Sequence, residues 1–268
     1  MAEAFIGALL QVGAVSPIQI RVADVLSDRL RHLNQTYGID TLNDNVELYD
    51  SCDMVILAVK PQQMAAVLTE IAERRNLSRE HRKLVISIAA GFPIRKIEQH
   101  LYAGLDENQR KRLPIIRVMP NTPALVLTGM SGMSTNEYAT DDDRRQTFYI
   151  LSQIGSVIEF AEKDLDAVTG LSGSGPAYIF YMVEAMIAAG ENVGLSSEHA
   201  RKLTLKTVEG ALALLRQSNE SAEQLRRKVT SPGGTTEAAL GVLKSYHFKQ
   251  AIVEAIAAAA RRAEELSR

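Results

Sequence analysis

The segment DMVILAVKP, residues 53–61, is the part of the sequence that decides the fold. Residues 53–59 are almost continuously apolar, which is typical of a parallel strand that is buried on both faces of its sheet. Lys60 and Pro61 end this strand, and the next fourteen residues, QQMAAVLTEIAERR, have the apolar spacing of an amphipathic helix. A buried strand, a short turn and a helix together form the repeating unit of an α/β fold.

The same pattern recurs on both sides of this segment. A strand is predicted at 18–24, a strand followed by a turn at 83–91 and again at 114–123, and two shorter strands at 129–135 and 156–160. Helices separate them, and the chain opens with one, in which Ala2, Phe5, Ile6, Leu9 and Leu10 form the apolar face. We therefore predict the α/β class with a doubly wound parallel sheet.

Ligands of such sheets bind beyond the carboxyl ends of the strands. This rule predicts that Asp24, Lys60, Ala89 and Asn121 lie along one rim of one sheet. Each of these residues alone is better explained as one that simply ends a strand, and it is their common placement that favours a binding site.

From about residue 163 the strand patterns stop and long helical patterns follow. Pro176 stands at the start of one helix, and Ser196 and Ser197 are candidate caps of the next. We predict a nucleotide-binding domain over residues 1–162 and an all-helical domain over residues 163–268. No low-complexity linker separates the two.

Composition excludes several classes of protein. A net charge of -2, no Trp and 5% aromatic residues disfavour nucleic-acid binding, and no apolar run is long enough to span a membrane. The single cysteine, Cys52, cannot form an intrachain disulfide, and we interpret it as a small buried filler. The five histidines show no metal-ligand spacing, so no metal is expected. A cytoplasmic location is expected, since the N-terminus lacks the positive region of a signal peptide.

Two glycine-containing segments of the second half are candidate sites. In LSGSGPAY, 171–178, Gly173 and Gly175 predict a turn with free N–H groups before a helix, and an ordinary helix entry explains them equally well. VTSPGGTTEAAL, 229–240, is more informative. Its Ser-Pro-Gly-Gly turn precedes a helix that opens with Thr235 and Thr236, and a helix N-terminus with flanking hydroxyls suits a small carboxylate.

These motifs, together with AVKPQ at 58–62 and RVMPNTPA at 117–124, occur in an order and spacing that resembles the pyrroline-5-carboxylate reductase family. The resemblance covers essentially the whole chain. It implies a Rossmann-like domain, a helical domain that forms a homodimer and often a decamer, and the reduction of 1-pyrroline-5-carboxylate to L-proline with NADPH or NADH.

The resemblance also implies roles for individual residues. Thr236 matches the threonine that hydrogen-bonds the imine nitrogen, and Glu220 matches an acid that contacts the ring nitrogen. The substrate carboxylate would meet Ser231, Gly233, Gly234 and Thr235. The cofactor contacts carry over to Asn45, Ala58, Val59, Lys60, Pro61, Ala89, Ala90 and Asn121.

Members of the family begin with a strand and a glycine loop before the helix that here opens the chain. We therefore expect this sequence to lack the first strand and the phosphate-binding loop. The cause would be a start placed too far downstream, a shortened version of a longer natural protein, or a genuine short form. Residues 18–24 would then be the family's second strand. An acid at its end, Asp24, commonly holds the ribose hydroxyls of NAD, while Arg21 and Arg29 argue for a 2′-phosphate, so the cofactor stays open between NADH and NADPH.

Two alternatives to this function remain. One is an oligomeric protein of the same fold with impaired cofactor binding, and the other is a related imine or hydroxy-acid reductase. Titration with the cofactor distinguishes the protein with impaired cofactor binding from the enzyme. Substrate profiling distinguishes a related reductase from a pyrroline-5-carboxylate reductase.

Overall fold

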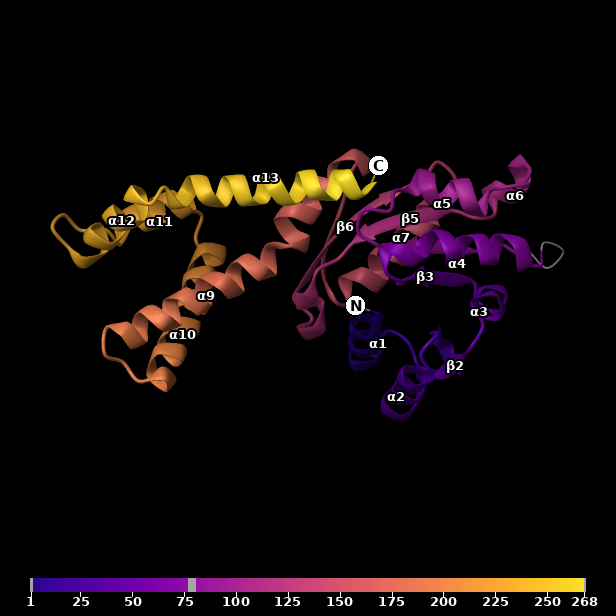
Figure 1. Ribbon diagram of the computed structural model, residues 1–268, viewed down its shortest axis with the longest axis horizontal. Coiled ribbons are helices and arrows are strands. Elements are labelled where there is room, and N and C mark those ends of the chain that lie inside the picture. The colour runs from indigo at the N-terminus through magenta and orange to yellow at the C-terminus, as the bar shows by residue number, and fades with distance from the viewer. Residues whose placement is uncertain (1, 77–80, 268) are drawn as a thin grey trace. The chain divides into compact units, whose positions relative to one another are not determined.

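The computed structural model describes residues 2–76 and 81–267, and it divides into two compact units (Figure 1). The first unit comprises Met1–Ser174 and Ala258–Arg268, and the second comprises Gly175–Ala257. The domain boundary predicted at residues 162 and 163 therefore falls within the first unit. The physical reason is that residues just beyond it are bonded to the sheet, since Arg117 of a central strand pairs with Asp166 at 3.3 Å.

The first unit contains a five-stranded sheet among its described residues, in the order β3-β4-β5-β6-β7. The strands are β3 (Met54–Leu57), β4 (Leu84–Ser87), β5 (Ile115–Met119), β6 (Gly129–Thr135) and β7 (Gly155–Glu159). The pairs β3–β4, β4–β5 and β6–β7 are parallel, as predicted, but β5 and β6 are antiparallel. The sequence could not show this reversal, because apolar periodicity is the same in both strand directions.

A separate two-stranded parallel sheet joins β1 (Arg21–Ala23) to β2 (Asp40–Leu42), a strand that the sequence did not reveal. Within residues 2–76 and 81–267, no strand pairs with both β1 and β3. The prediction that Asp24 lies on the same sheet as Lys60, Ala89 and Asn121 is therefore wrong: Asp24 follows β1, whereas the other three follow strands of the larger sheet.

Helices connect the strands of the first unit, and their ends follow local sequence signals. Gly38 ends α2 with φ of 67°, a left-handed conformation that glycine adopts readily, as predicted. Thr140 and Asp143 form a reciprocal capping box at the start of α7. The helices are α1 (Ala2–Gln11), α2 (Ser27–Tyr37), α3 (Asn45–Ser51), α4 (Pro61–Arg74), α5 (Ile94–Leu101), α6 (Glu107–Lys111), α7 (Asp141–Ser152) and α8 (Leu165–Val168).

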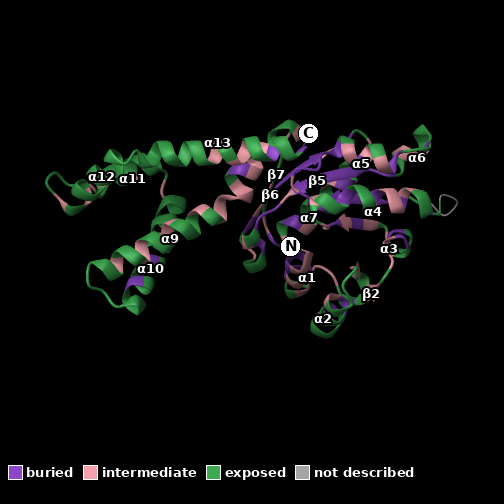
Figure 2. Ribbon diagram, viewed as in Figure 1, coloured by how far each residue is buried: buried purple, intermediate pink, exposed green. Residues whose placement is uncertain are grey.

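The larger sheet is buried on both faces, as the apolar runs predicted (Figure 2). Neighbouring strand residues point to opposite faces, so Ile115 belongs to one hydrophobic cluster and Ile116 to another. The first cluster contains Met64 and Leu68 of α4, and Cys52 packs against it as a half-buried filler. The second contains residues of α1 and α7.

The second unit is built of helices and buries few of its own side chains. Its helices are α9 (Gly175–Asn192), α10 (Ser197–Gln217), α11 (Ala222–Lys228), α12 (Thr235–Ser245) and the first part of α13 (Phe248–Ser267). Among its large apolar residues, Phe180 is 66% exposed and Tyr246 is 81% exposed. No helix in the described part of the chain combines the length and the apolar character that a membrane crossing requires.

Candidate functional site

The carboxyl ends of β3, β4 and β5 place most of the predicted cofactor residues at one edge of the larger sheet. Ala58, Val59 and Lys60 connect β3 to α4, and Pro61 is the first residue of that helix. Ala89 and Ala90 follow β4, and Asn121 follows β5. Because these three strands are adjacent and parallel, their ends meet at the same edge.

The start of α4 is an open helix N-terminus at this edge. Lys60 is the N-cap residue, but its side chain makes no capping hydrogen bond, and Pro61 occupies the first turn. The cap residue therefore provides no side-chain acceptor for the N–H groups at the positive end of the helix dipole. Such an N-terminus, directly after a parallel strand, fits the phosphate groups of a dinucleotide.

Asp24 and Asn45 lie at the carboxyl end of the smaller sheet. Asp24 follows β1 and accepts a hydrogen bond from the backbone N–H of Leu26 at 2.9 Å. Asn45 is the first residue of α3, which follows β2, and its side-chain amide donates to Glu70 at 3.3 Å. Both residues therefore follow strands of the two-stranded sheet, whereas the other predicted cofactor residues follow strands of the larger sheet.

Asn121 is buried, and its side chain makes hydrogen bonds within its own unit. Its side-chain amide donates to the backbone carbonyl of Ser172 at 3.2 Å and to the Ser172 hydroxyl at 3.3 Å, and its carbonyl oxygen accepts from the N–H of Met130 at 2.8 Å. Asn121 therefore ties the end of β5 to residues 169–173 and to β6. Sequence reasoning missed this bond to Ser172, which is 51 residues away.

Residues 169–173 form a π-helical turn that leads into α9. The prediction of an open turn with free N–H groups at Gly173 and Gly175 is therefore wrong. Gly173 has a packing role, since a Cβ added there would lie 2.4 Å from the Met119 Cε atom. At Gly173 the geometry supports the ordinary interpretation, a residue that permits close packing at the helix entry, whereas a Cβ at Gly175 would meet nothing within 4 Å.

In the second unit, Ser231–Gly234 forms the predicted tight turn before α12. Gly233 has φ of 71°, a left-handed conformation, and the Gly234 N–H donates to the Ser231 carbonyl at 3.1 Å. A Cβ at Gly234 would lie 2.6 Å from the Ser231 hydroxyl oxygen and 3.1 Å from its backbone oxygen, so a larger residue here would force the Ser231 side chain to move. Gly234 caps α12 without a side chain, which leaves this helix N-terminus open.

Thr236 is half-buried on the first turn of α12, and in the described part of the chain its hydroxyl has no hydrogen-bond partner. Ser231, Gly233 and Thr235 are exposed beside it. The turn thus presents free hydroxyl groups and an uncapped helix N-terminus on one short segment. This is an arrangement that can hold a small carboxylate and orient a nearby polar group.

Two contacts of the predicted substrate residues were not foreseen. The Glu237 carboxylate accepts a hydrogen bond from the Gly233 N–H at 2.8 Å, and Lys228 donates to Glu220 at 2.7 Å. A glutamate three residues into a helix often reaches back to its N-terminus, so the first contact had a sequence signal. An external carboxylate that uses the Gly233 N–H must displace Glu237.

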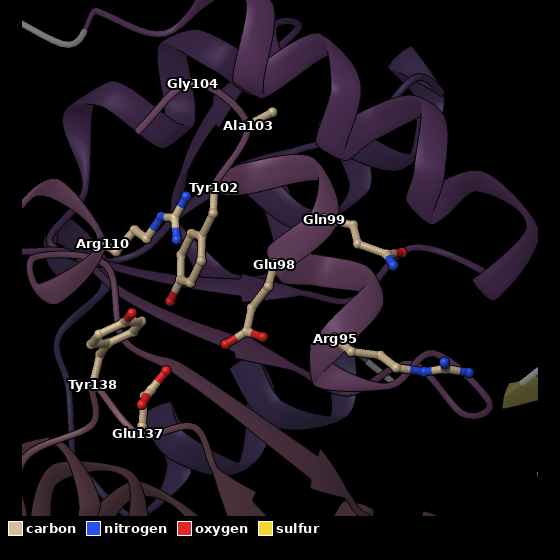
Figure 3. Close-up of a pocket in the computed structure, with 9 residues that line it drawn as sticks. All are labelled: Arg95, Glu98, Gln99, Tyr102, Ala103, Gly104, Arg110, Glu137 and Tyr138. Atoms are coloured by element: carbon tan, nitrogen blue, oxygen red, sulfur yellow. The ribbon is translucent and has the colours of Figure 1, made fainter. Parts of the chain in front are cut away.

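Figure 3 shows a separate hollow on the first unit, lined by α5 and by residues 137 and 138. Its volume is about 510 Å³, and none of the predicted site residues lines it. Tyr102 at its floor donates to the Leu113 carbonyl at 2.7 Å and accepts from the Asn136 amide at 2.7 Å. Burial raises the pKa of the Tyr102 hydroxyl. These bonds are internal, so Tyr102 fixes the packing of the loop that follows β6.

The two halves of the chain match two family descriptions. Residues 1–91 match "NADP oxidoreductase coenzyme F420-dependent", and residues 162–266 match "Pyrroline-5-carboxylate reductase dimerisation". A Rossmann-like sheet with an open carboxyl edge, followed by a helical dimerisation domain, defines an NAD(P)-dependent oxidoreductase, and this chain is one.

Relatives over the full length identify the family. A pyrroline-5-carboxylate reductase of Synechocystis sp. is 40% identical over 100% of this chain and 95% of its own, and one of Bacillus subtilis is 39% identical over 99% and 91%. The structure of a pyrroline-5-carboxylate reductase from Coxiella burnetii has a TM-score of 0.85 and 37% identity, covering 100% of this chain and 95% of that one. The chain belongs to the pyrroline-5-carboxylate reductase family.

A structure from Plasmodium falciparum, described with NADP bound, is also similar. Its TM-score is 0.87 and its identity is 29%, over 99% of this chain and 94% of that one. The predicted fold class, the enzyme class and the use of NAD(P)H are thereby confirmed.

Proposed function

We propose that the chain reduces the cyclic imine 1-pyrroline-5-carboxylate to L-proline with NADPH or NADH. The observation that carries this proposal is the Ser231–Gly234 turn at the uncapped N-terminus of α12. It offers N–H groups and hydroxyls to a small carboxylate, and the Thr236 hydroxyl lies on the first turn of the same helix. Family membership supplies the reaction class, and this turn supplies a place for the substrate's charged end.

The substrate residues divide into two groups by what they hold. Ser231, Gly233, Gly234 and Thr235 hold the carboxylate through N–H groups and hydroxyls, once Glu237 has released the Gly233 N–H. Thr236 orients the ring nitrogen, because a hydroxyl can donate to an imine or accept from its protonated form. Glu220, now paired with Lys228, lies on the segment before α11 and contacts the ring nitrogen from there.

The cofactor residues belong to the first unit. We assign the ribose and phosphate contacts to Asp24, Asn45 and the Ala58–Pro61 segment, and the remaining contacts to Ala89, Ala90 and Asn121. The open N-terminus of α4 fits a dinucleotide, as does the carboxylate of Asp24, which no cation pairs with among the residues that the structure describes. When bound, the reduced nicotinamide supplies a hydride to the imine carbon. Asn121 also holds the Ser172 segment in place.

The assembly that we propose is a homodimer formed through the helical domain, residues 163–268, with a decamer as the larger state. The exposed apolar side chains of α9 and α10 support this, since monomeric proteins rarely expose so many. The nucleotide-binding domain over residues 1–162 and the cytoplasmic location remain predictions.

The test is a spectrophotometric assay of NADH and NADPH oxidation with 1-pyrroline-5-carboxylate. We expect turnover from the full chain, and a drop in kcat/KM of about 10- to 100-fold in Thr236→Ala, the effect of one lost hydrogen bond to a charged group. Thr207→Ala, an exposed threonine of α10, is the matched control and should leave kcat/KM unchanged. Unchanged kinetics in Thr236→Ala would remove Thr236 from the reaction.

The break in pairing between β1 and β3 is the observation that favours the alternative of an oligomeric protein with impaired cofactor binding. Calorimetric titration with both dinucleotides separates the two functions. Binding without turnover would instead favour a related imine or hydroxy-acid reductase, to be identified by substrate profiling.

A further inference from the structure

The segment that follows β1 carries one acid and two exposed apolar residues. Asp24 is followed by Val25, which is 84% exposed, and Leu26, which is 63% exposed. The Leu26 N–H already donates to one oxygen of Asp24, so this part of the turn does not offer it to a ligand. Asp24, Val25 and Leu26 therefore bring no side-chain hydrogen-bond donor to the end of β1, but they do bring a carboxylate with a second oxygen free to accept.

The basic side chains near this turn are all occupied. Arg21 pairs with Asp40 across the two-stranded sheet at 3.3 Å, Arg29 pairs with Glu3 of α1, and Arg31 pairs with Asp28. His32 also lies on Glu3, at 3.0 Å. Between residues 17 and 42, a range that the structure describes throughout, no Arg or His is left without an acidic partner.

These two observations bear on the ribose of the cofactor. In a Rossmann-like domain, an acid at the end of this strand accepts a hydrogen bond from the ribose 2′-hydroxyl of NAD, whereas a 2′-phosphate requires a free cation. Here the phosphate would meet the Asp24 carboxylate, and each described guanidinium between residues 17 and 42 would first have to leave its acidic partner to offset the repulsion between two anions. We infer that the chain selects NAD(H) over NADP(H), with Asp24 as the specificity-determining residue. This inference rests on the proposed function, since it assumes that a dinucleotide binds at this edge.

The first experiment is isothermal titration calorimetry of the full chain with NAD⁺ and with NADP⁺, which needs no turnover. We expect NAD⁺ to bind at least about 10-fold more tightly, the change expected from one hydrogen bond to a charged group. Equal affinities, or tighter binding of NADP⁺, would overturn the inference and leave the proposed function standing. If neither nucleotide binds, both are contradicted.

The second experiment assigns the preference to Asp24. In Asp24→Ser, the affinity for NAD⁺ should fall by about 10-fold while that for NADP⁺ holds or improves. The double variant with Val25→Arg should reverse the preference, because it adds a guanidinium to an exposed position beside the ribose.

The matched control is Glu47→Gln, which removes the same charge from an exposed acid of α3 that pairs with no cation in the described part of the chain. It should leave the ratio of the two affinities unchanged. An equal shift in Glu47→Gln would show that the general charge of this region sets the preference, and Asp24 would lose its assigned role. The ratio of kcat/KM for NADH and NADPH should follow the calorimetric ratio in each variant.

Discussion

The two units of this protein treat their apolar and charged side chains in opposite ways. In the α/β unit, Met64 and Leu68 are fully buried between helix and sheet, and Arg117 is enclosed with two carboxylates. In the helical unit, Phe180 and Tyr246 are mostly exposed. The α/β unit contains its own core, while the helical unit presents apolar faces that only another surface can cover. The difference indicates that the first unit is stabilised from within and the second by assembly.

The largest expected effect is at the buried ion pairs of the α/β unit. Arg117 is 4% exposed and pairs with Glu162 and Asp166, both at 3.3 Å. Arg117→Leu leaves two carboxylates without their cation, and we expect a loss of about 3–5 kcal/mol in the free energy of unfolding. Urea unfolding followed by circular dichroism measures it. The control is Arg144→Leu, since Arg144 also pairs with two acids but is 36% exposed. An equal effect of both changes would contradict the importance of burial.

The next prediction compares the stability lost when one leucine of each unit is replaced by alanine. Leu68→Ala should cost about 2–5 kcal/mol, because it opens a cavity in a packed core. Leu203→Ala in α10 removes a side chain that is 56% exposed in the single chain, and at concentrations where the chain is monomeric it should cost within about 0.5 kcal/mol. Urea unfolding at several protein concentrations gives both values. A large loss from Leu203→Ala in the monomer would show that the helical unit has an internal core after all.

The third prediction tests what covers the apolar faces. If a second copy of the chain does so, Phe180→Glu should weaken the dimer by about 2 kcal/mol or more, which is about 30-fold in Kd, since exposed aromatic residues often dominate an interface. Sedimentation equilibrium measures the Kd. Ile18→Glu, at an isoleucine of the α/β unit that is 88% exposed, is the control and should leave Kd unchanged.

The smallest expected effect is the pH dependence of the stability that one buried acid, Asp143, gives to the α/β unit. Burial raises the pKa of Asp143, but hydrogen bonds from Thr140 and Arg82 outweigh it and hold the pKa below its usual value of 3.8. The folded α/β unit therefore releases this proton more readily than the unfolded chain. Its stabilising effect is present above pH 3.8 and is lost as the pH falls through the lower folded-state pKa.

Asp143→Asn should cost about 1 kcal/mol at pH 7 and less near pH 3, measured by urea unfolding at each pH. The exposed neighbour Asp142→Asn is the control and should change little at either pH. A loss that is equal at pH 7 and at pH 3 would show that the charge of Asp143 does not stabilise the unit.

The sequence by itself determined the elements and the family. Strand runs, helical periodicity and the Ser-Pro-Gly-Gly turn are local patterns. β3 (Met54–Leu57) lies within the predicted strand at residues 53–59, and β5 (Ile115–Met119) is the strand part of the strand and turn predicted at 114–123. The short strand β2 escaped notice because three residues carry too little periodicity to distinguish them from a loop. Motifs in a fixed order then identified the family without any knowledge of how the elements pack.

The tertiary structure alone decided which groups are available for a ligand. Arg29 and Glu3 are 26 residues apart, Asn121 and Ser172 are 51 apart, and Arg21 meets Asp40 across a sheet. From the sequence, Arg21 and Arg29 were cations near the ribose site. In the folded chain each is held by a carboxylate, while Asp24 is not held by any cation in the part of the chain that the structure describes. A paired charge must leave its partner before it can bind a ligand directly, and such pairings are set by folding.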